Sequence, residues 1–254
     1  MGLARKPDSG IAAEVLSAPL YRALTHVFAQ GGRGVMLVGG TALAGYYAAH
    51  RRSDDLDLFT EDPLAQRAAI LSVQSLRQLG SSFADERSSA HFYHATCRLD
   101  GHDFTAQVVL DSNLFAIGSS LEADDGVVVA TPETLLKMKA ATLVSRASEK
   151  DLYDLAWFFG EDEQLDIANL IALGLEVDGG MNGEAVLTNL VGAEMHESAC
   201  DFSLSQSAKE VLTEVARVQQ SLIQCVKNHL REQPAPPIAR LIRMLKLSPG
   251  STRR

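Results

Sequence analysis

Two aspartates separated by one residue, Asp55 and Asp57, are the side chains of this sequence best suited to bind a divalent cation. They lie in an alternating segment that predicts a strand over residues 56–59, so both carboxylates project from one strand face. Carboxylates this close repel each other unless a cation lies between them. Oxygen ligands suit Mg²⁺ or Mn²⁺, which can stabilise a phosphoryl group in transfer. The alternative is a solvent-facing strand end without a role, and the pair alone does not exclude it.

A glycine turn precedes the two aspartates. Gly39, Gly40 and Thr41 follow a short apolar strand at residues 35–38 and begin a predicted helix over residues 41–50. Backbone N–H groups at the start of a helix bind anions, and glycine lets a phosphate approach the backbone closely. The turn is not a dinucleotide fingerprint, and it lacks the lysine of a P-loop. An ordinary turn capped by Thr41 is the alternative, but the aspartate pair on the next strand favours a nucleotide site.

A second set of charged residues lies further along the chain. Lys139 and Arg146 are two helical turns apart and therefore share one helix face, where they could bind a triphosphate. Lys150 and Asp151 begin the next predicted helix, where the carboxylate also favours the helix dipole. The alternative is a surface salt bridge between Lys150 and Asp154, worth only ~0.3–0.5 kcal/mol.

Taken together, these segments resemble the nucleotidyltransferase core of the abortive-infection AbiEii/AbiGii toxins. Those proteins are the toxin components of type IV toxin–antitoxin systems, within the polymerase-beta-like nucleotidyltransferase superfamily. The first motif is Gly39-Gly40-Thr41-Ala42-Leu43, followed by Arg52-Ser53-Asp54-Asp55-Leu56-Asp57-Leu58-Phe59. The second is Lys139-Ala140-Ala141, Arg146 and Lys150-Asp151-Leu152-Tyr153-Asp154-Leu155. The two motifs cover about residues 35–160.

The resemblance implies a role for each of these residues. It implies that Asp55, Asp57, Lys139 and Asp151 are catalytic, with Asp55 and Asp57 as metal ligands and Lys139 in contact with a nucleotide phosphate. The implied nucleotide-binding residues are Gly39, Gly40, Thr41, Arg52, Ser53, Arg146 and Lys150. It also implies an NTP substrate with Mg²⁺ or Mn²⁺.

One position departs from the superfamily pattern. Members of the superfamily often add a third metal-binding carboxylate from a later strand, here the segment of residues 104–111. The best alignment places Gln107 at that position, and a glutamine can ligate a metal only through a neutral carbonyl oxygen. Asp111 lies two steps further on the same predicted strand face and is the alternative third ligand.

The remaining pattern predicts strands in the first half of the chain and helices in the second. The predicted helices cover residues 11–30, 41–50, 66–79, 131–145, 149–159 and 238–247, and the predicted strands residues 35–38, 56–59, 91–99, 104–110 and 127–130. Asp100-Gly101 predicts a hairpin between two of these strands. We expect an α+β fold in which helices flank a nucleotidyltransferase-like mixed sheet. Residues 1–130 would form the core, and the mainly helical residues 131–254 would complete the site and the acceptor groove.

Composition limits the class of protein. The net charge of −9 argues against non-specific coating of nucleic acid, yet residues 227–254 carry seven Lys or Arg and one Glu. This basic end could contact a phosphate backbone, but on charge alone a solvated helix face with a frayed end is the favoured explanation. Three widely separated cysteines predict neither a disulfide framework nor a zinc site, and no apolar run approaches the ~18 residues that span a bilayer. We therefore expect a cytoplasmic protein without a membrane segment.

Three functions remain open. The leading hypothesis is an Mg²⁺-dependent nucleotidyltransferase toxin of a toxin–antitoxin or phage-defence system that transfers NMP from NTP to RNA. Resemblance to the family implies tRNA as the acceptor and a separate cognate antitoxin protein as a partner. The second hypothesis is the same chemistry on a small molecule such as an aminoglycoside, which the negative charge suits, or on a protein hydroxyl. The third is a catalytically weak nucleotide-binding module that acts through a partner, and Gln107 motivates it.

Overall fold

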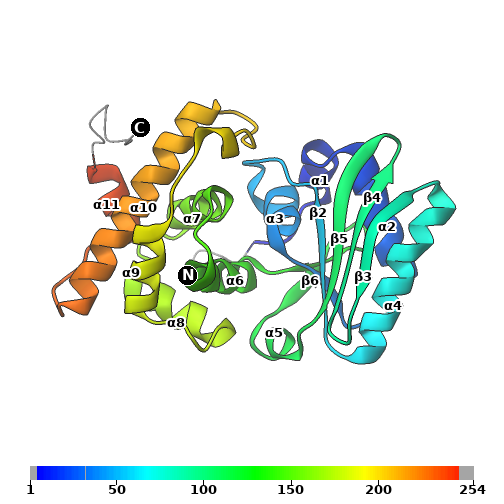
Figure 1. Cartoon of the computed structure of the whole chain (residues 1–254), viewed down its shortest axis with the longest axis horizontal. Helices are drawn as coiled ribbons and strands as arrows, with labels where there is room; N and C mark the ends of the chain where they lie inside the picture. The colour runs from blue at the N-terminus through cyan, green and yellow to red at the C-terminus, as the bar shows by residue number, and fades with distance from the viewer. Residues whose placement is uncertain (1–4, 32, 246–254) are drawn as a thin grey trace. The chain divides into compact units, whose positions relative to one another are not determined.

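The computed structural model describes residues 5–31 and 33–245 and divides the chain into two compact units (Figure 1). Of the described residues, 5–31 and 33–135 form the first unit, and 136–245 form the second. The boundary falls inside helix α6 (Pro132–Ser145), a few residues after the division predicted between residues 130 and 131.

A seven-stranded mixed sheet with the order β3-β4-β5-β2-β1-β7-β6 forms the centre of the first unit. Its strands are β1 (Val35–Leu37), β2 (Asp55–Thr60), β3 (Ser82–Ser88), β4 (Phe92–Leu99), β5 (His102–Leu110), β6 (Ser120–Glu122) and β7 (Val128–Ala130). β2 pairs in parallel with β5 and antiparallel with β1, and β1 pairs in parallel with β7. This mixed sheet, with helices around it and a helical part after it, confirms the predicted fold class.

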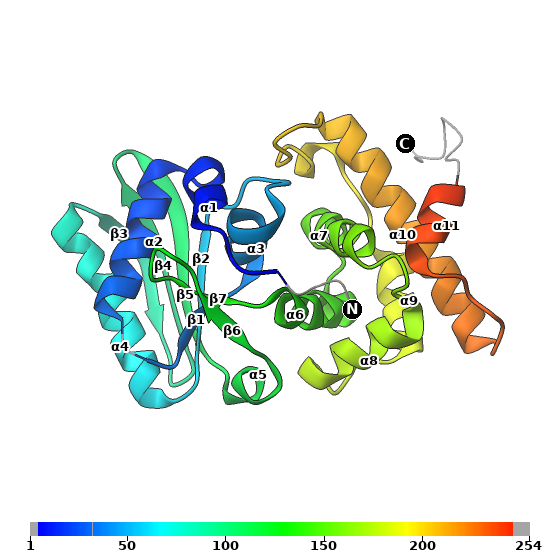
Figure 2. The same ribbon diagram turned by 180° about the vertical axis from the view of Figure 1, so that it is seen from behind.

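One face of the sheet forms the core of this unit. Leu56 and Leu58 on β2, and Ala106 and Val108 on β5, are fully buried. Helices α2 (Ala18–Gln30) and α4 (Pro63–Gln74) pack against these strands, as Figure 2 shows from behind. Since successive side chains of a strand alternate between faces, the aspartates of β2 point to the opposite face.

Several local predictions hold and others fail. The strands β4 and β5 form the predicted hairpin, in which Asp100 and Gly101 both have positive φ angles. The single helix predicted over residues 11–30 is wrong: the structure has α1 (Ser9–Val15) and α2, because Ser17 caps α2 at the N–H of Leu20 and Pro19 has no N–H to continue α1. Strand β3 went unpredicted because it is an exposed edge strand whose sequence lacks apolar alternation.

Short helices connect the remaining strands of this unit. Helix α3 (Gly39–Leu43) continues as a π-helical turn over Ala44–Ala48, and Ala49, with a left-handed φ of 49°, redirects the chain toward β2. After α4 a 3₁₀ turn covers Ser75–Leu79, and α5 (Ser112–Ile117) follows β5.

The described part of the second unit is helical. It contains the later part of α6, then α7 (Glu149–Glu161), α8 (Ile167–Val177), α9 (Gly183–Gly192), a 3₁₀ turn at Glu197–Ala199, α10 (Ala208–Leu230) and α11 (Ile238–Met244). A capping box between Ser207 and Glu210 begins the long helix α10. Residues 246 and 247 of the last predicted helix lie outside the described residues. None of the described helices combines the length and apolar character that crossing a membrane requires.

Candidate active site

Asp55 and Asp57 are the first and third residues of β2 and project from the same face of the sheet. Leu56 and Leu58, which alternate with them, are fully buried in the core, whereas the two aspartates are only half-buried. The apolar residues thus anchor the strand, and the carboxylates stand side by side on its other face.

Hydroxyl groups from two other elements hold Asp55 in place. The parallel register between β2 and β5 puts Thr105 beside Asp55 and Gln107 beside Asp57. Thr105 Oγ1 donates a hydrogen bond of 2.6 Å to Oδ1 of Asp55. On the other side, Thr41 Oγ1 donates to the main-chain oxygen of Asp55. Thr41 therefore ties α3 to β2 rather than capping its own turn.

The two glycines of the turn are required by what lies against them. Gly39 has a φ of +71°, and a Cβ atom there would collide with the carboxylate of Asp57. A Cβ atom on Gly40 would collide with the guanidinium of Arg51 and would lie 2.8 Å from Oγ of Ser53. Val38, at the N-cap of α3, makes no side-chain capping hydrogen bond. The two glycines thus let the carboxylate of Asp57 and the guanidinium of Arg51 lie close to the backbone of the turn.

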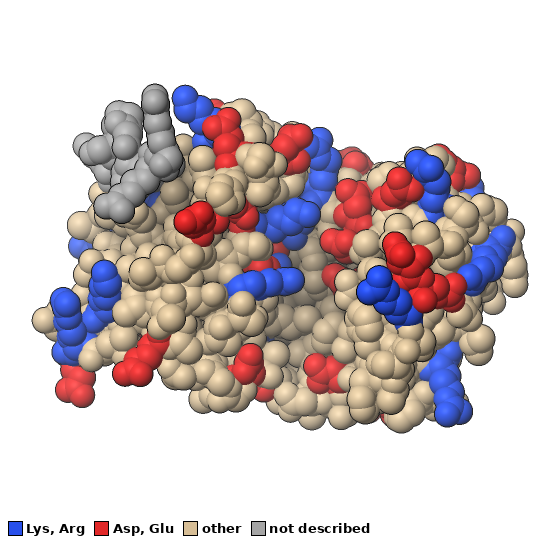
Figure 3. Space-filling view, viewed as in Figure 1, with Lys and Arg blue, Asp and Glu red and all other residues tan. Residues whose placement is uncertain are grey.

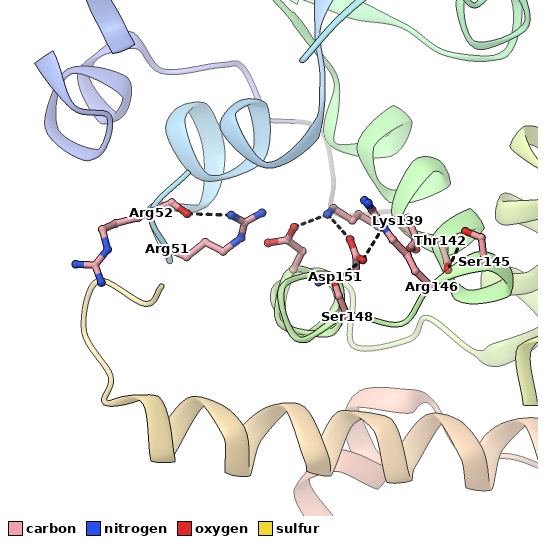
Figure 4. Close-up of polar contacts among 9 residues, drawn as sticks. Arg51, Arg52, Lys139, Thr142, Ser145, Arg146, Ser148 and Asp151 are labelled. Carbon is pink, nitrogen blue, oxygen red and sulfur yellow. Dashed lines mark hydrogen bonds and ion pairs between the residues drawn. The ribbon is translucent and has the colours of Figure 1, made fainter. Parts of the chain in front are cut away.

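The arginine at this turn is Arg51, which the sequence-based prediction missed. Arg51 is only 3% exposed, while the neighbouring Arg52, the predicted nucleotide-binding residue, is exposed. Arg51 Nη1 donates a hydrogen bond of 2.9 Å to the main-chain oxygen of Arg52 (Figure 4). The sequence did contain a signal for Arg51. As the chain enters β2, alternate residues point the same way, and Arg51 is in phase with Ser53 and Asp55, whereas Arg52 is not.

In the second unit, Lys139 is buried between two carboxylates from α7. Its Nζ lies 2.8 Å from Oδ1 of Asp151 and 2.7 Å from Oδ2 of Asp154, and both aspartates are almost fully buried. Figure 4 shows the ammonium group directed at Asp151. Asp154 thus pairs with Lys139, and not with Lys150 as the alternative from the sequence suggested. Lys150 is exposed.

Asp151 remains ionised inside this cluster. Burial by itself raises the pKa of the Asp151 carboxyl, but the charge and hydrogen bond of Lys139, together with Ser148 and Arg146, outweigh burial and hold the pKa below its ordinary value. Ser148 contributes in the same direction, because its hydroxyl donates a hydrogen bond of 2.6 Å to Oδ2 of Asp151. Arg146, whose side chain is 68% exposed, reaches the same oxygen with Nε at 3.1 Å. The structure thus brings Lys139, Arg146 and Asp151 together. Spacing had predicted only that Lys139 and Arg146 share one helix face, and Arg146 lies just after the end of α6.

The structure does not bring Asp111 to the aspartate pair. Asp111 follows the end of β5 and caps α5, where its Oδ1 accepts a hydrogen bond of 2.9 Å from the N–H of Leu114. Gln107 lies directly beside Asp57. Asp111 is four residues further along the chain than Gln107, which corresponds to roughly 13 Å of extended strand. Gln107 therefore occupies the position next to the pair, and the geometry gives Asp111 a capping role.

A family model described as nucleotidyl transferase AbiEii toxin of type IV toxin–antitoxin systems matches residues 22–199, which is more than half of the chain. The chain belongs to the AbiEii family of nucleotidyl transferase toxins. Membership implies a nucleotidyl transfer enzyme and a cognate antitoxin. A comparison with the curated proteins finds no significant match.

Two solved structures are similar to this AbiEii-family chain, and the first of them agrees with its fold. MenT4, nucleotidyltransferase toxin Rv2826c from Mycobacterium tuberculosis H37Rv, is 16% identical, with a TM-score of 0.50 over 94% of this chain and 98% of that one. JHP933 from Helicobacter pylori is also 16% identical, with a TM-score of 0.47 over 87% of this chain and 95% of that one.

The residues of this AbiEii-family chain fit a hard divalent cation. Asp55 and Asp57 offer carboxylate oxygens on one face, and Gln107 beside Asp57 offers an amide oxygen, while the hydroxyl of Thr105 donates its hydrogen bond to Asp55. Among the described residues no group of three or more His, Cys, Asp or Glu side chains could hold a metal ion. Two carboxylates completed by water and substrate phosphates suit Mg²⁺ or Mn²⁺, whereas a structural zinc site needs four protein ligands.

Proposed function

We propose that this protein is an Mg²⁺-dependent (or Mn²⁺-dependent) toxin that transfers NMP from an NTP to RNA, with tRNA as the acceptor. The observation that carries the proposal is the contact between Gly39 and Asp57, in which a glycine with a positive φ leaves room for a carboxylate beside Asp55. In the reaction, an acceptor hydroxyl attacks the α-phosphorus, a new oxygen–phosphorus bond forms, and pyrophosphate leaves. Asp55 and Asp57 would hold the cation, which when bound neutralises charge on the phosphoryl oxygens.

The turn and the residues against it would bind the nucleotide. Backbone N–H groups of Gly40 and Thr41 can donate to phosphate oxygens, because no side chain caps them. Arg51 replaces Arg52 as the arginine of this proposal, since its buried guanidinium lies against Gly40 together with Ser53. A planar guanidinium matches the geometry of phosphate oxygens and stays charged when buried.

Lys139 and Asp151 would also serve the reaction. Two carboxylates hold the ammonium of Lys139 at a defined position, so it can bind a phosphate without first being ordered. Arg146 is the exposed member of this cluster and Lys150 lies at the start of α7, and both would add positive charge for a polyphosphate.

RNA is the acceptor that family membership favours, and we place the reaction in the cytoplasm, where NTPs and tRNA are present. Basic and acidic side chains are interspersed on the face seen in Figure 3, so binding would rely on local contacts. Lys227, Arg231 and Arg240 belong to the basic end predicted from the sequence, as does Arg243, which pairs with Glu163 at 2.6 Å. Lys246, Arg253 and Arg254 of that end lie outside the described residues.

A label-transfer assay tests the proposal. The purified protein is incubated with Mg²⁺, total tRNA and each NTP labelled at its α-phosphate, beside the Asp55→Asn and Asp57→Asn variants. Asp54→Asn is the matched control, because Asp54 is the exposed neighbour that pairs with His102 instead. We expect label on tRNA from the wild type and from Asp54→Asn, and a loss of about 100-fold or more in the other two.

The other outcomes decide between the alternative functions. Label on a small molecule or a protein would move the acceptor away from RNA while keeping the chemistry. Bound NTP with no labelled product on any acceptor would contradict the transferase and favour the catalytically weak module.

A further inference from the structure

Strand β5 places a hydroxyl and an amide, but no carboxylate, beside the aspartate pair. Its side chains beside the aspartate pair are Thr105, in register with Asp55, and Gln107, in register with Asp57. Both are half-buried on the face that carries the aspartates, while Ala106 between them is fully buried in the core. The side chains that β5 places beside Asp55 and Asp57 are therefore both uncharged.

The contact between Thr105 and Asp55 fixes one carboxylate oxygen. The distance of 2.6 Å from Thr105 Oγ1 to Asp55 Oδ1 is that of a short, charge-assisted hydrogen bond. Because Oδ1 accepts this bond, the rotation of the Asp55 carboxylate is restrained. The other oxygen, Oδ2, therefore keeps a defined direction. Thr41 holds the main chain of Asp55 through its carbonyl, so the backbone and the side chain of Asp55 are both restrained.

We propose that Thr105 is a positioning residue that orients Asp55 for the divalent cation. The inference rests on the proposed function, because it assumes that Asp55 and Asp57 bind that cation. Among the described residues no third carboxylate joins the pair to hold the cation if Asp55 rotates away. Hydrogen-bonding partners of metal ligands typically contribute a factor of about 10–100 to metal affinity. A large share of the cation affinity should therefore depend on one hydroxyl that never touches the metal.

Titration with Mn²⁺ tests this without any turnover. Free Mn²⁺ is measured by electron paramagnetic resonance against the full-length wild type, Thr105→Val, Thr105→Ser and Asp55→Asn. The matched control is Thr96→Val, the same substitution at the register partner of Thr105 on β4. Valine keeps the volume and favours a strand, so these variants should fold, and Thr105→Ala provides a second variant without the hydroxyl.

We expect Thr105→Val and Thr105→Ala to weaken Mn²⁺ binding by about 10–100-fold, and Thr105→Ser to restore it to within about threefold of the wild type. Thr96→Val should bind as the wild type does. Wild-type affinity in Thr105→Val or Thr105→Ala, or an equally weak Thr105→Ser, would overturn the role of Thr105 and leave the proposed function intact. If Asp55→Asn binds Mn²⁺ as tightly as the wild type, the metal site itself fails, and the inference fails with it.

Discussion

The ammonium of Lys139 lies 2.7 Å from the carboxylate of Asp154, and the side chain of Asp154 is completely buried. A buried pair of this kind is held by hydrogen bonds and Coulomb attraction, against a desolvation cost for each ion. Asp151 is the second partner of the same lysine, so one buried cation contacts two buried anions, and the exposed Arg146 also reaches Asp151. Lys139 is consequently the residue that joins the two buried carboxylates.

Replacing Lys139 by methionine should lower the free energy of unfolding by about 3–5 kcal/mol, because two buried carboxylates lose their cation. Urea denaturation followed by circular dichroism measures this. Lys137→Met is the matched control: Lys137 pairs at 2.8 Å with Glu176, whose side chain is 43% exposed and can turn to water. Equal losses in the two variants would show that the cluster around Lys139 has no special charge balance.

The pH dependence of stability should report Asp151. The pKa of its carboxyl is lower in the folded protein than in the unfolded chain, since Lys139, Ser148 and Arg146 together outweigh the effect of burial. Ionised Asp151 therefore stabilises the fold fully above the unfolded pKa of about 3.9, and this contribution is lost as the pH falls through the lower, folded pKa. The stability difference between wild type and Asp151→Asn, measured by urea denaturation from about pH 6 to pH 3, should shrink toward low pH. A difference that stays constant over this range would contradict the assignment.

Comparing alanine substitutions at Gly39 and Gly80 distinguishes a loss of stability from a loss of cation binding. Gly39→Ala and Gly80→Ala should each lose about 1–2 kcal/mol of stability, because both positions have a positive φ angle. No atom lies within 4 Å of a Cβ added at Gly80, whereas one at Gly39 meets the Asp57 carboxylate. Only Gly39→Ala should therefore weaken Mn²⁺ binding, by about tenfold or more. Mn²⁺ titration beside thermal denaturation checks both effects, and similar Mn²⁺ affinities in the two variants would exclude the contact as a functional one.

Adjacent arginines offer a matched test of the nucleotide site. Arg51→Lys should raise the dissociation constant for NTP by about tenfold, or 1.4 kcal/mol, because lysine cannot reproduce the planar guanidinium against Gly40. Arg52→Lys, at the exposed neighbour, should change it by less than about twofold. Isothermal titration calorimetry with the NTP that the transfer assay identifies gives both values. A larger effect at Arg52 would show that Arg52, as first predicted from the sequence, is the arginine that binds the nucleotide.

A carboxylate at residue 107 should strengthen the cation site. Gln107→Asp puts a third negative charge beside Asp57, so the metal-free protein should lose stability through repulsion. The same variant should bind Mn²⁺ about tenfold more tightly, since hard cations gain from each added carboxylate. Thr96→Asp, with the same charge on β4, is the control and should leave the Mn²⁺ affinity near that of the wild type. Unchanged affinity in Gln107→Asp would mean that residue 107 does not reach the cation.

The sequence by itself determined the features that depend on short-range periodicity. Asp55 and Asp57 share a face because they lie two apart on a strand, and Asp100-Gly101 closes a hairpin because its residues tolerate positive φ angles. The two motifs were also sufficient to indicate the family, which the family model confirms.

The tertiary structure decided what depends on contacts between distant segments. Thr105 and Asp55 are 50 residues apart, and only the register between β5 and β2 makes them partners. The same register sets Gln107 beside Asp57 and leaves Asp111 to cap α5. Arg51 and Arg52 have the same side chain, and it is the position of the Arg51 guanidinium against Gly40 that assigns Arg51 to the turn. The physical reason is that spacing fixes the direction of a side chain relative to its own element, whereas its partners follow from how elements pack.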